Sequence, residues 1–234
     1  MRHHRRPAPP RPLDDDPFHK TSLGLARNLI ACTTLRQLTG KQMRSLEDLT
    51  IVQELACFGG KVGDDDLPLD KLRIRLRRLL KSKAGQPRPP REPGEPVKKN
   101  LTLVADLLGL SKADGEVLLF LLALNHGDGL QELTCIFGGM ALSRGARLIA
   151  AALHAPLSRI LDVLSPRGRL ISAGMVQVQE HDNWNLEDIV ALHPKLMDLM
   201  MRPGLNRRRF VDRFLPEAGP GELVRSDYEH VEGE

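Results

Sequence analysis

Two glycine–lysine pairs come closest in this chain to a phosphate-binding motif. A P-loop needs a glycine five residues before the pair and a Ser or Thr directly after it, so that amides, lysine and hydroxyl surround phosphate and metal. Gly40–Lys41 lacks the upstream glycine and is followed by Gln42. Gly60–Lys61 lacks it too and is followed by Val62. We therefore expect that this chain does not hydrolyse nucleotide by itself.

Metal and nucleophile chemistry have equally little support. The densest group of metal-ligand residues is Glu180-His181-Asp182, yet three adjacent residues cannot all point at one ion from a regular element. His126 and Asp128 form a pair without a third ligand, whereas structural zinc sites take four ligands. No serine lies in a G-x-S-x-G motif. The sequence predicts a protein that is not an enzyme, with no catalytic residues, no metal site and no cofactor.

The most informative stretch is Arg147–Gln179. An apolar, alanine-rich helix meets a corner at His154–Ala155, and a second helix starts at Pro156. After Ser165–Pro166 the apolar residues shift towards two-residue alternation, which is typical of strands. Helix, short turn, helix and strand pair is the order of a winged helix-turn-helix. We predict this module, with a small β-wing, over about residues 141–180.

If the module binds DNA, its second helix, Pro156–Leu164, would enter the major groove, and the wing would present arginines to phosphates. That helix carries a single Arg, whose charge is opposed by Asp162, and this gives few hydrogen-bond donors for reading bases. Winged helices also bind proteins, and we favour that use over DNA binding. Arg167 and Arg169 flank Gly168, and they are equally explained if they only keep an exposed turn soluble. The candidate contact residues are Arg144, Arg147, Ser158, Arg159, Arg167 and Arg169.

Basic residues gather in the amino half of the chain. The formal net charge is +4 and the pI is about 9.1, but the charge is spread unevenly. A helical segment between positions 69 and 83 carries a leucine stripe and cations on its other faces. Such a helix could contact phosphates or acidic protein surfaces, or could simply be a solvated helix face. Its candidate contact residues are Lys71, Arg73, Arg75, Arg77, Arg78 and Lys81.

Composition and proline content predict a mainly α protein in several parts. Hydrophobic residues make up 41% of the chain but aromatic residues only 3%, which favours helices over a β-sandwich. Five prolines between positions 85 and 96 predict a stiff, extended linker. We expect a basic, Pro-rich disordered tail over 1–19, a helical bundle over 20–84, the linker over 85–99, a helical domain with the winged helix over 100–215, and a flexible tail over 216–234.

Local signals place several elements of the second unit. Asn100 is a good N-cap for a helix ending at Gly109. Ser111-x-x-Asp114 resembles a capping box, and the apolar run behind it, up to Leu124, predicts the central buried helix. A short strand or edge is expected near Leu186–Val190.

Cysteine usage and hydropathy indicate the compartment. Cys32, Cys57 and Cys135 form no C-x-x-C pair and lie in apolar helical contexts, so we expect small buried hydrophobes in a reducing environment. The amino terminus lacks the apolar core of a signal peptide. The most apolar run, Val117–Leu124, is much shorter than the roughly 20 residues of a membrane span. We expect a cytoplasmic protein without membrane contact.

An ordered series of segments resembles the region that precedes the ATPase module in certain large bacterial AAA-type ATPases. The segments are L-L-G-L-S-K-A-D-G-E-V-L-L-F-L-L-A-L, L-S-R-G-A-R-L-I-A-A-A-L, L-D-V-L-S-P-R-G-R-L-I-S-A-G-M-V, L-M-D-L-M-M-R-P-G-L, R-R-R-F-V-D-R-F-L-P and S-D-Y-E-H-V. Together they cover about Asn100 to Val231.

The ATPase module itself is absent from this chain, so the family's nucleotide-binding residues have no positions here. The resemblance implies a regulatory or partner-engaging region that acts through its winged helix. The implied partner is a protein, including an ATPase module or ring. The alternative is a DNA-binding winged-helix transcriptional regulator. The sequence leaves the oligomeric state open.

Overall fold

The computed structural model describes residues 16–32, 45, 49–56, 69–82, 86–179 and 184–214. The predicted carboxy-terminal tail and the Glu180-His181-Asp182 group lie outside the described residues, as does most of the predicted amino-terminal tail. The disordered tail was predicted to extend to residue 19, and this predicted boundary is wrong. Phe18 is fully buried and helix α1 begins at His19, because the aromatic ring packs into the core.

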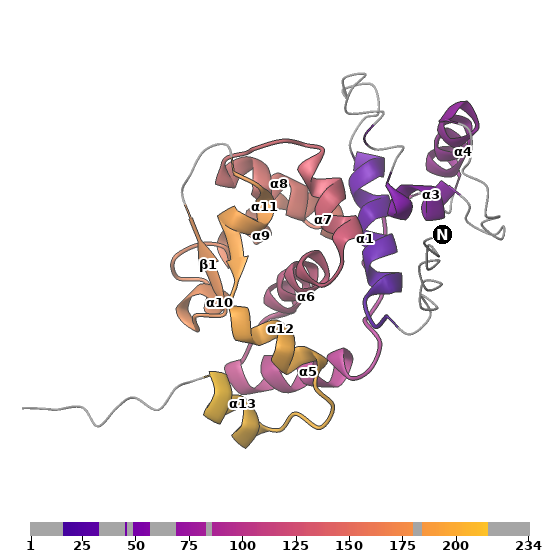
Figure 1. Cartoon of the computed structure of the whole chain (residues 1–234). Helices are drawn as coiled ribbons and strands as arrows, with labels where there is room; N and C mark the ends of the chain where they lie inside the picture. The colour runs from indigo at the N-terminus through magenta and orange to yellow at the C-terminus, as the bar shows by residue number, and fades with distance from the viewer. Residues whose placement is uncertain are drawn as a thin grey trace, which may run out of the picture.

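The described part of the chain is mainly helical, as its composition predicts, and contains one two-stranded sheet (Figure 1). None of its helices is long and apolar enough to cross a membrane. The elements are α1 (His19–Cys32), α3 (Thr50–Ala56), α4 (Leu69–Lys81), α5 (Val97–Leu108), α6 (Lys112–His126), α7 (Asp128–Cys135), α8 (Leu142–Leu153), α9 (Leu157–Val163), α10 (Arg169–Ser172), β1 (Val176–Val178), α11 (Leu186–Ile189), β2 (Val190–Leu192), α12 (Pro194–Met201) and α13 (Arg207–Phe214).

Helix α6 is the central element, as its sequence predicts. The predicted capping box is present, because Asp114 N donates to Ser111 Oγ at 3.2 Å and Ser111 N donates to the Asp114 carboxylate at 2.8 Å. Every residue from Val117 to Leu124 is buried. Figure 1 shows α6 near the middle of the molecule, with α1 on one side and β1 and α10 on the other. A helix that is apolar on all faces needs cover on all faces, and its neighbours supply it.

The sheet differs from its prediction at both ends. β1 and β2 pair antiparallel, with Gln177 opposite Ala191, and an isolated bridge joins Met140 to Trp184. The strand expected near Leu186–Val190 is a short helix followed by β2 from Val190 onwards. The alternation predicted after Ser165–Pro166 was misread at Leu170, since this residue lies in α10 and is fully buried. In a segment of only four residues, one helical turn and a strand give similar spacings of apolar residues, so spacing alone cannot distinguish them.

Helix α1 shares one core with the carboxy-terminal helices. It packs against α6, α7 and α8 as well as against α3. The proline-rich segment, predicted as a linker, runs along α1: Thr21 Oγ1 donates to Arg91 O at 2.9 Å and Asn28 Nδ2 donates to Arg88 O at 2.7 Å. The residues from 86 to 94 are extended, as proline requires, but this extended segment is fixed to α1 instead of separating α1 from the helices that follow.

Asn100 has a different role from the predicted one. Helix α5 starts at Val97 with Pro96 at its N-cap position, so Asn100 lies inside the helix and is buried. Its Nδ2 group donates to Met200 O at 2.8 Å and Arg202 O at 2.7 Å. An amide carries two donors, and here they satisfy carbonyls at the end of α12, which lack partners within that helix.

Candidate interaction surface

The predicted helix–turn–helix corner is formed by α8 and α9. His154 has φ 52° and ψ 44°, the left-handed conformation that commonly ends a helix, and it occurs here in a residue other than glycine. His154 N donates to Ala151 O at 3.2 Å and Ala155 N donates to Ala150 O at 2.9 Å, which closes the end of α8. Pro156 holds the N-cap position of α9, so the helix begins at Leu157, one residue after the predicted start.

A hollow of about 440 Å³ lies at this corner, and we call it the corner pocket. Its walls are mostly small apolar side chains, and its polar side chains are Arg147 and His154. Cys32, at the end of α1, also lines the corner pocket, so residues more than a hundred positions apart in the sequence meet at this site. The lining residues are Cys32, Arg147, Ala150, Ala151, His154, Ala155, Pro156 and Leu157.

The structure brings four of the predicted contact residues onto this helix pair. Arg144 and Arg147 are exposed on α8, and Ser158 and Arg159 are exposed on α9. Leu161, on the same short helix, leaves 43% of its surface exposed. The exposed surface of α8 and α9 therefore combines separate cations with apolar area.

The other two predicted contact residues are not on a wing. The sheet connection runs from β1 to β2, well after Arg167 and Arg169 in the chain. Arg167 is exposed in the turn between α9 and α10. Arg169 belongs to α10, and its guanidinium donates to Leu108 O and Gly109 O. These are carbonyls at the carboxyl end of α5, where a cation is electrostatically favoured. Arg169 therefore has a structural partner, which its sequence neighbours do not reveal.

Replacement of Arg169 by Ala tests this assignment. We expect Arg169→Ala to lower the free energy of unfolding by about 1 kcal/mol, because the carbonyls at the end of α5 lose a charged donor. Arg167→Ala, two residues away, is the matched control and should change stability by less than about 0.5 kcal/mol. Urea unfolding of both variants provides the measurement. Equal stability of the two variants would contradict the capping role.

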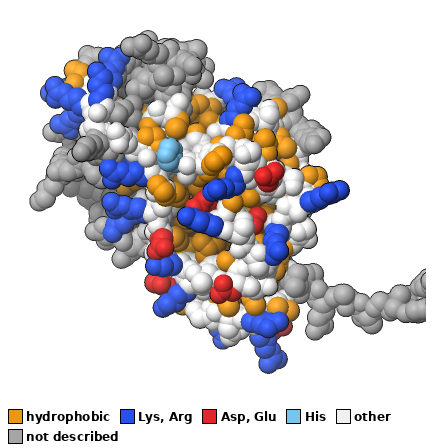
Figure 2. Space-filling model, turned by 180° about the vertical axis from the view of Figure 1, so that it is seen from behind, with side chains coloured by type: hydrophobic (Ala, Val, Ile, Leu, Met, Phe, Trp, Pro, Cys, Tyr) orange, Lys and Arg blue, Asp and Glu red, His pale blue; other side chains and the backbone are white. Residues whose placement is uncertain are grey.

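The basic helix α4 is separate from this surface. Leu76 is buried against its neighbours and α4 packs on α3, while five of its cations are exposed. Figure 1 places α4 and α10 at opposite sides of the molecule, and Figure 2 shows a dense group of Lys and Arg at the upper left and scattered ones elsewhere on that face. The exposed cations are Lys71, Arg75, Arg77, Arg78 and Lys81. The side chain of Arg73 is not among the described ones.

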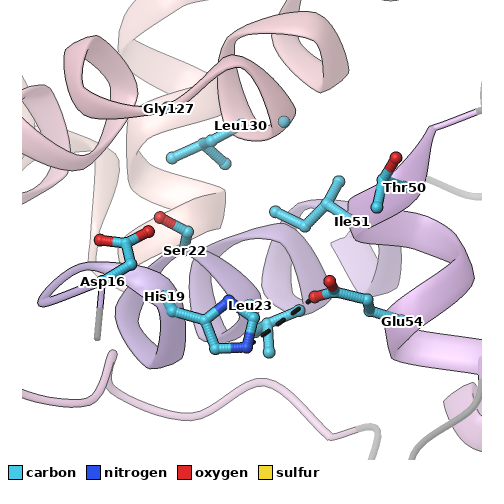
Figure 3. A pocket seen from close by; sticks show the side chains of 10 residues that line it. Asp16, His19, Ser22, Leu23, Thr50, Ile51, Glu54, Gly127 and Leu130 are labelled. Atoms are coloured by element: carbon cyan, nitrogen blue, oxygen red, sulfur yellow. Dashed lines mark ion pairs between the residues drawn. The ribbon is translucent and has the colours of Figure 1, made fainter. Parts of the chain in front are cut away.

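A second hollow, of about 200 Å³, lies between α1, α3 and the start of α7, and Figure 3 shows its lining. His19 Nε2 lies 3.9 Å from Glu54 Oε2, which links α1 to α3. His126 Nε2 lies 3.0 Å from Asp16 Oδ1, and the His126 ring is tilted by 43° against the Phe18 ring with centroids 4.8 Å apart. His126 and Asp128 were predicted as a candidate metal pair; in the structure His126 lies beside Asp16, and the side chain of Asp128 is not among the described ones. Within the described ranges, no three His, Cys, Asp or Glu side chains converge to hold a metal.

The cysteines were predicted to be buried, and this is wrong for the two that are described. Cys32 and Cys135 are exposed free thiols at helix ends. Each thiol is still partly shielded: burial raises the pKa of Cys32, and burial followed by Glu187 raises the pKa of Cys135. Cys57 lies outside the described residues.

No family model, no curated protein and no solved structure matches this chain.

Proposed function

We propose that this chain is a non-catalytic interaction region that binds a protein partner at the surface of α8 and α9. The observation that carries the proposal is the corner pocket, whose walls are mostly apolar and include Leu157 of α9, the helix that also carries the exposed Leu161. Apolar area of this kind gains free energy when a protein partner covers it. A DNA backbone offers charge instead, and DNA-binding surfaces are correspondingly rich in cations.

The element order supports the proposal of a winged-helix arrangement. Helices α6, α8 and α9 are followed by the antiparallel pair β1 and β2, and the bridge between Met140 and Trp184 adds a short contact before α8. In this arrangement α9 takes the place of the recognition helix. It spans seven residues and offers Arg159 as its cation, with Asp162 of opposite charge also exposed. Such a helix is better suited to a protein than to base edges.

The chemistry of the corner pocket specifies the partner. Alanines, Pro156 and Leu157 accept an apolar side chain, and Arg147 supplies positive charge beside it. We infer a partner segment with one apolar anchor flanked by acidic residues, since complementary charge directs the register of an interface. The resemblance to the region preceding the module of AAA-type ATPases proposes an ATPase module or ring as the carrier of that segment.

DNA binding is the second candidate, and the observation that favours it is α4. Its five exposed cations lie on one helix and form a basic surface. This surface would add phosphate contacts without base recognition. Figure 1 shows α4 at the right edge of the molecule and α9 nearer its middle, so one duplex would have to span the distance between them to use both surfaces.

A crosslinking experiment with a DNA control tests the proposal. A photo-reactive amino acid at position 147, in the corner pocket, should give a discrete protein adduct in the producing cell. The same amino acid at position 208, on α13, is the control and should not give that adduct. Introducing Ala151→Glu should remove it, because a like charge in the wall of the corner pocket would repel an acidic segment.

Titration with a labelled DNA duplex at two salt concentrations tests the DNA-binding alternative. We expect weak binding that disappears at higher salt and is unchanged when Arg147 and Arg159 are both replaced by Ala. DNA binding that survives the higher salt and is lost in this double variant, with nucleic acid crosslinked at position 147, would show that the protein-binding proposal is wrong.

A further inference from the structure

The second hollow, of about 200 Å³, lies at the amino-terminal end of α1, and we call it the α1–α3 hollow. Its lining comes from the start of α1, from α3 and from the first residues of α7 with the turn before them. The corner pocket meets α1 at Cys32, the opposite end of that helix, so the two hollows are separate. Pockets for drug-sized ligands enclose about 300–1,000 Å³, so the α1–α3 hollow suits a smaller ligand.

Polar side chains lie at two ends of this hollow, as Figure 3 shows. Asp16 and Ser22 lie at one end, and Glu54 and Thr50 lie at the other. The wall between the two ends is apolar and includes the buried side chain of Ile51. A ligand that matches this lining is apolar in its middle and polar at both of its ends.

Each end carries a carboxylate that can accept further hydrogen bonds. Asp16 Oδ1 accepts from Phe18 N at 2.8 Å and lies 3.0 Å from His126 Nε2. Asp16 Oδ2 accepts no hydrogen bond from the described residues. Glu54 Oε2 lies 3.9 Å from His19 Nε2, which is beyond hydrogen-bond distance, and no described residue donates to the Glu54 carboxylate. The side chain of Glu54 is only 19% exposed, so water solvates this carboxylate only in part.

The hollow has no fixed cation that matches these carboxylates. Within the described part of the chain, no Lys or Arg belongs to its lining. Two carboxylates at the two ends therefore make the hollow negative, and a ligand with a positive charge at each end would offset that charge. The hydroxyl groups of Ser22 and Thr50 add one further acceptor at each end.

We propose that the α1–α3 hollow binds a short linear diamine. A primary ammonium group has three N–H donors and no acceptor, so it matches an end that consists of carboxylate and hydroxyl oxygens. The methylene chain between the two ammonium groups covers the apolar wall and removes it from water. A monoamine would leave one of the two carboxylates without a partner. A bound diamine would connect α1 with α3, two helices that also pack on each other.

Thermal unfolding of the whole chain, at about pH 8 where aliphatic amines are charged, tests the proposal. The probes are diaminobutane, butylamine and butanediol, each compared with sodium chloride at the same ionic strength. A ligand that binds only the folded state raises Tm, and for diaminobutane at tenfold excess over Kd we expect a rise of about 3–5 °C beyond that in chloride. Butylamine should give a smaller rise and butanediol none. In a series from diaminoethane to diaminooctane the rise should pass through a maximum, because the two ends of the hollow are fixed.

Two variants test the two ends separately. Glu54→Gln keeps the size of the side chain and removes the charge at one end. Asp16→Asn keeps an oxygen for Phe18 N and removes the charge at the other end. In each variant diaminobutane should raise Tm no more than butylamine does, whereas a purely structural role would lower Tm and leave the difference between the two amines unchanged.

Glu132→Gln is the control, because it removes a carboxylate from an exposed position of α7 outside the hollow. This variant should keep the full difference between diaminobutane and butylamine. The proposal is overturned if the two amines raise Tm equally in the unmodified protein, if the rise shows no maximum with chain length, or if Glu54→Gln and Asp16→Asn both respond as Glu132→Gln does.

Discussion

Replacing Asn28 by Ala should lower the free energy of unfolding by about 3 kcal/mol and Tm by roughly 10 °C. Asn28 is 0% exposed, and its amide joins three segments of the chain. Its Nδ2 donates to Arg88 O and to Ala152 O, both at 2.7 Å, and its Oδ1 accepts from Arg88 N at 3.2 Å. The variant leaves two carbonyls and one amide without their partner, and the carbonyl of Ala152 is deep in the protein.

Asn125→Ala is the matched control, because it removes the same chemical group from an exposed site. Asn125 Nδ2 donates to Leu121 O at 2.8 Å within α6, and the residue is exposed. Water can replace that donor, so we expect a change below about 0.5 kcal/mol. Guanidinium unfolding followed by circular dichroism gives both values. Similar losses in the two variants would mean that Asn28 does not hold the proline-rich segment and α8 to α1.

The role of Asn28 shows why the proline-rich segment was misread from the sequence. Proline content correctly predicts extended backbone without helix, since the ring fixes φ and removes the amide donor. It carries no information on what the segment contacts. The contacts depend on two polar residues, Thr21 and Asn28, that are seven positions apart on one face of a helix elsewhere in the chain. Buried polar residues in an otherwise amphipathic helix are the signal that points to such a neighbour.

Elements defined by local chemistry were predicted best. Helix α6 combines a reciprocal capping box with an uninterrupted apolar run, and both features act within a few residues of each other. The corner at His154 was found for the same reason, because an alanine-rich helix, a short turn and Pro156 are adjacent in sequence. Local signals of this kind do not depend on the rest of the fold.

Roles that depend on tertiary contact could not be predicted in the same way. Asn100 and Arg169 have the right chemistry for an N-cap and for a phosphate contact, respectively. Both instead donate to carbonyls at the end of a helix that is distant in sequence: α12 for Asn100 and α5 for Arg169. A donor side chain is compatible with many acceptors, and only the packing of α5 against α6 and α12 decides which acceptor is near. The candidate contact surface therefore includes the predicted residues on α8 and α9 but not Arg167 and Arg169, which follow α9 in the chain.

The second large effect is expected at Gly168, in the turn that joins α9 to α10. An added Cβ there would lie 2.0 Å from the carbonyl oxygen of Val163 and 2.9 Å from its carbon. Both are backbone atoms at the end of α9, so a rotamer change cannot relieve the overlap. Gly168→Ala should therefore displace the turn and lower the free energy of unfolding by about 3 kcal/mol or more. Urea unfolding measures the loss.

Gly115→Ala gives the opposite sign and separates the steric effect from the general cost of replacing glycine. Gly115 lies inside α6 and an added Cβ meets nothing within 4 Å, so the variant should gain about 0.5–1 kcal/mol from helix propensity. Because an added Cβ at Gly168 would push against the end of α9, Gly168→Ala should weaken the crosslink from position 147 even at temperatures where the variant is folded, whereas Gly115→Ala should leave that crosslink unchanged. A stable Gly168→Ala variant with an intact crosslink would show that the turn between α9 and α10 does not position the corner pocket.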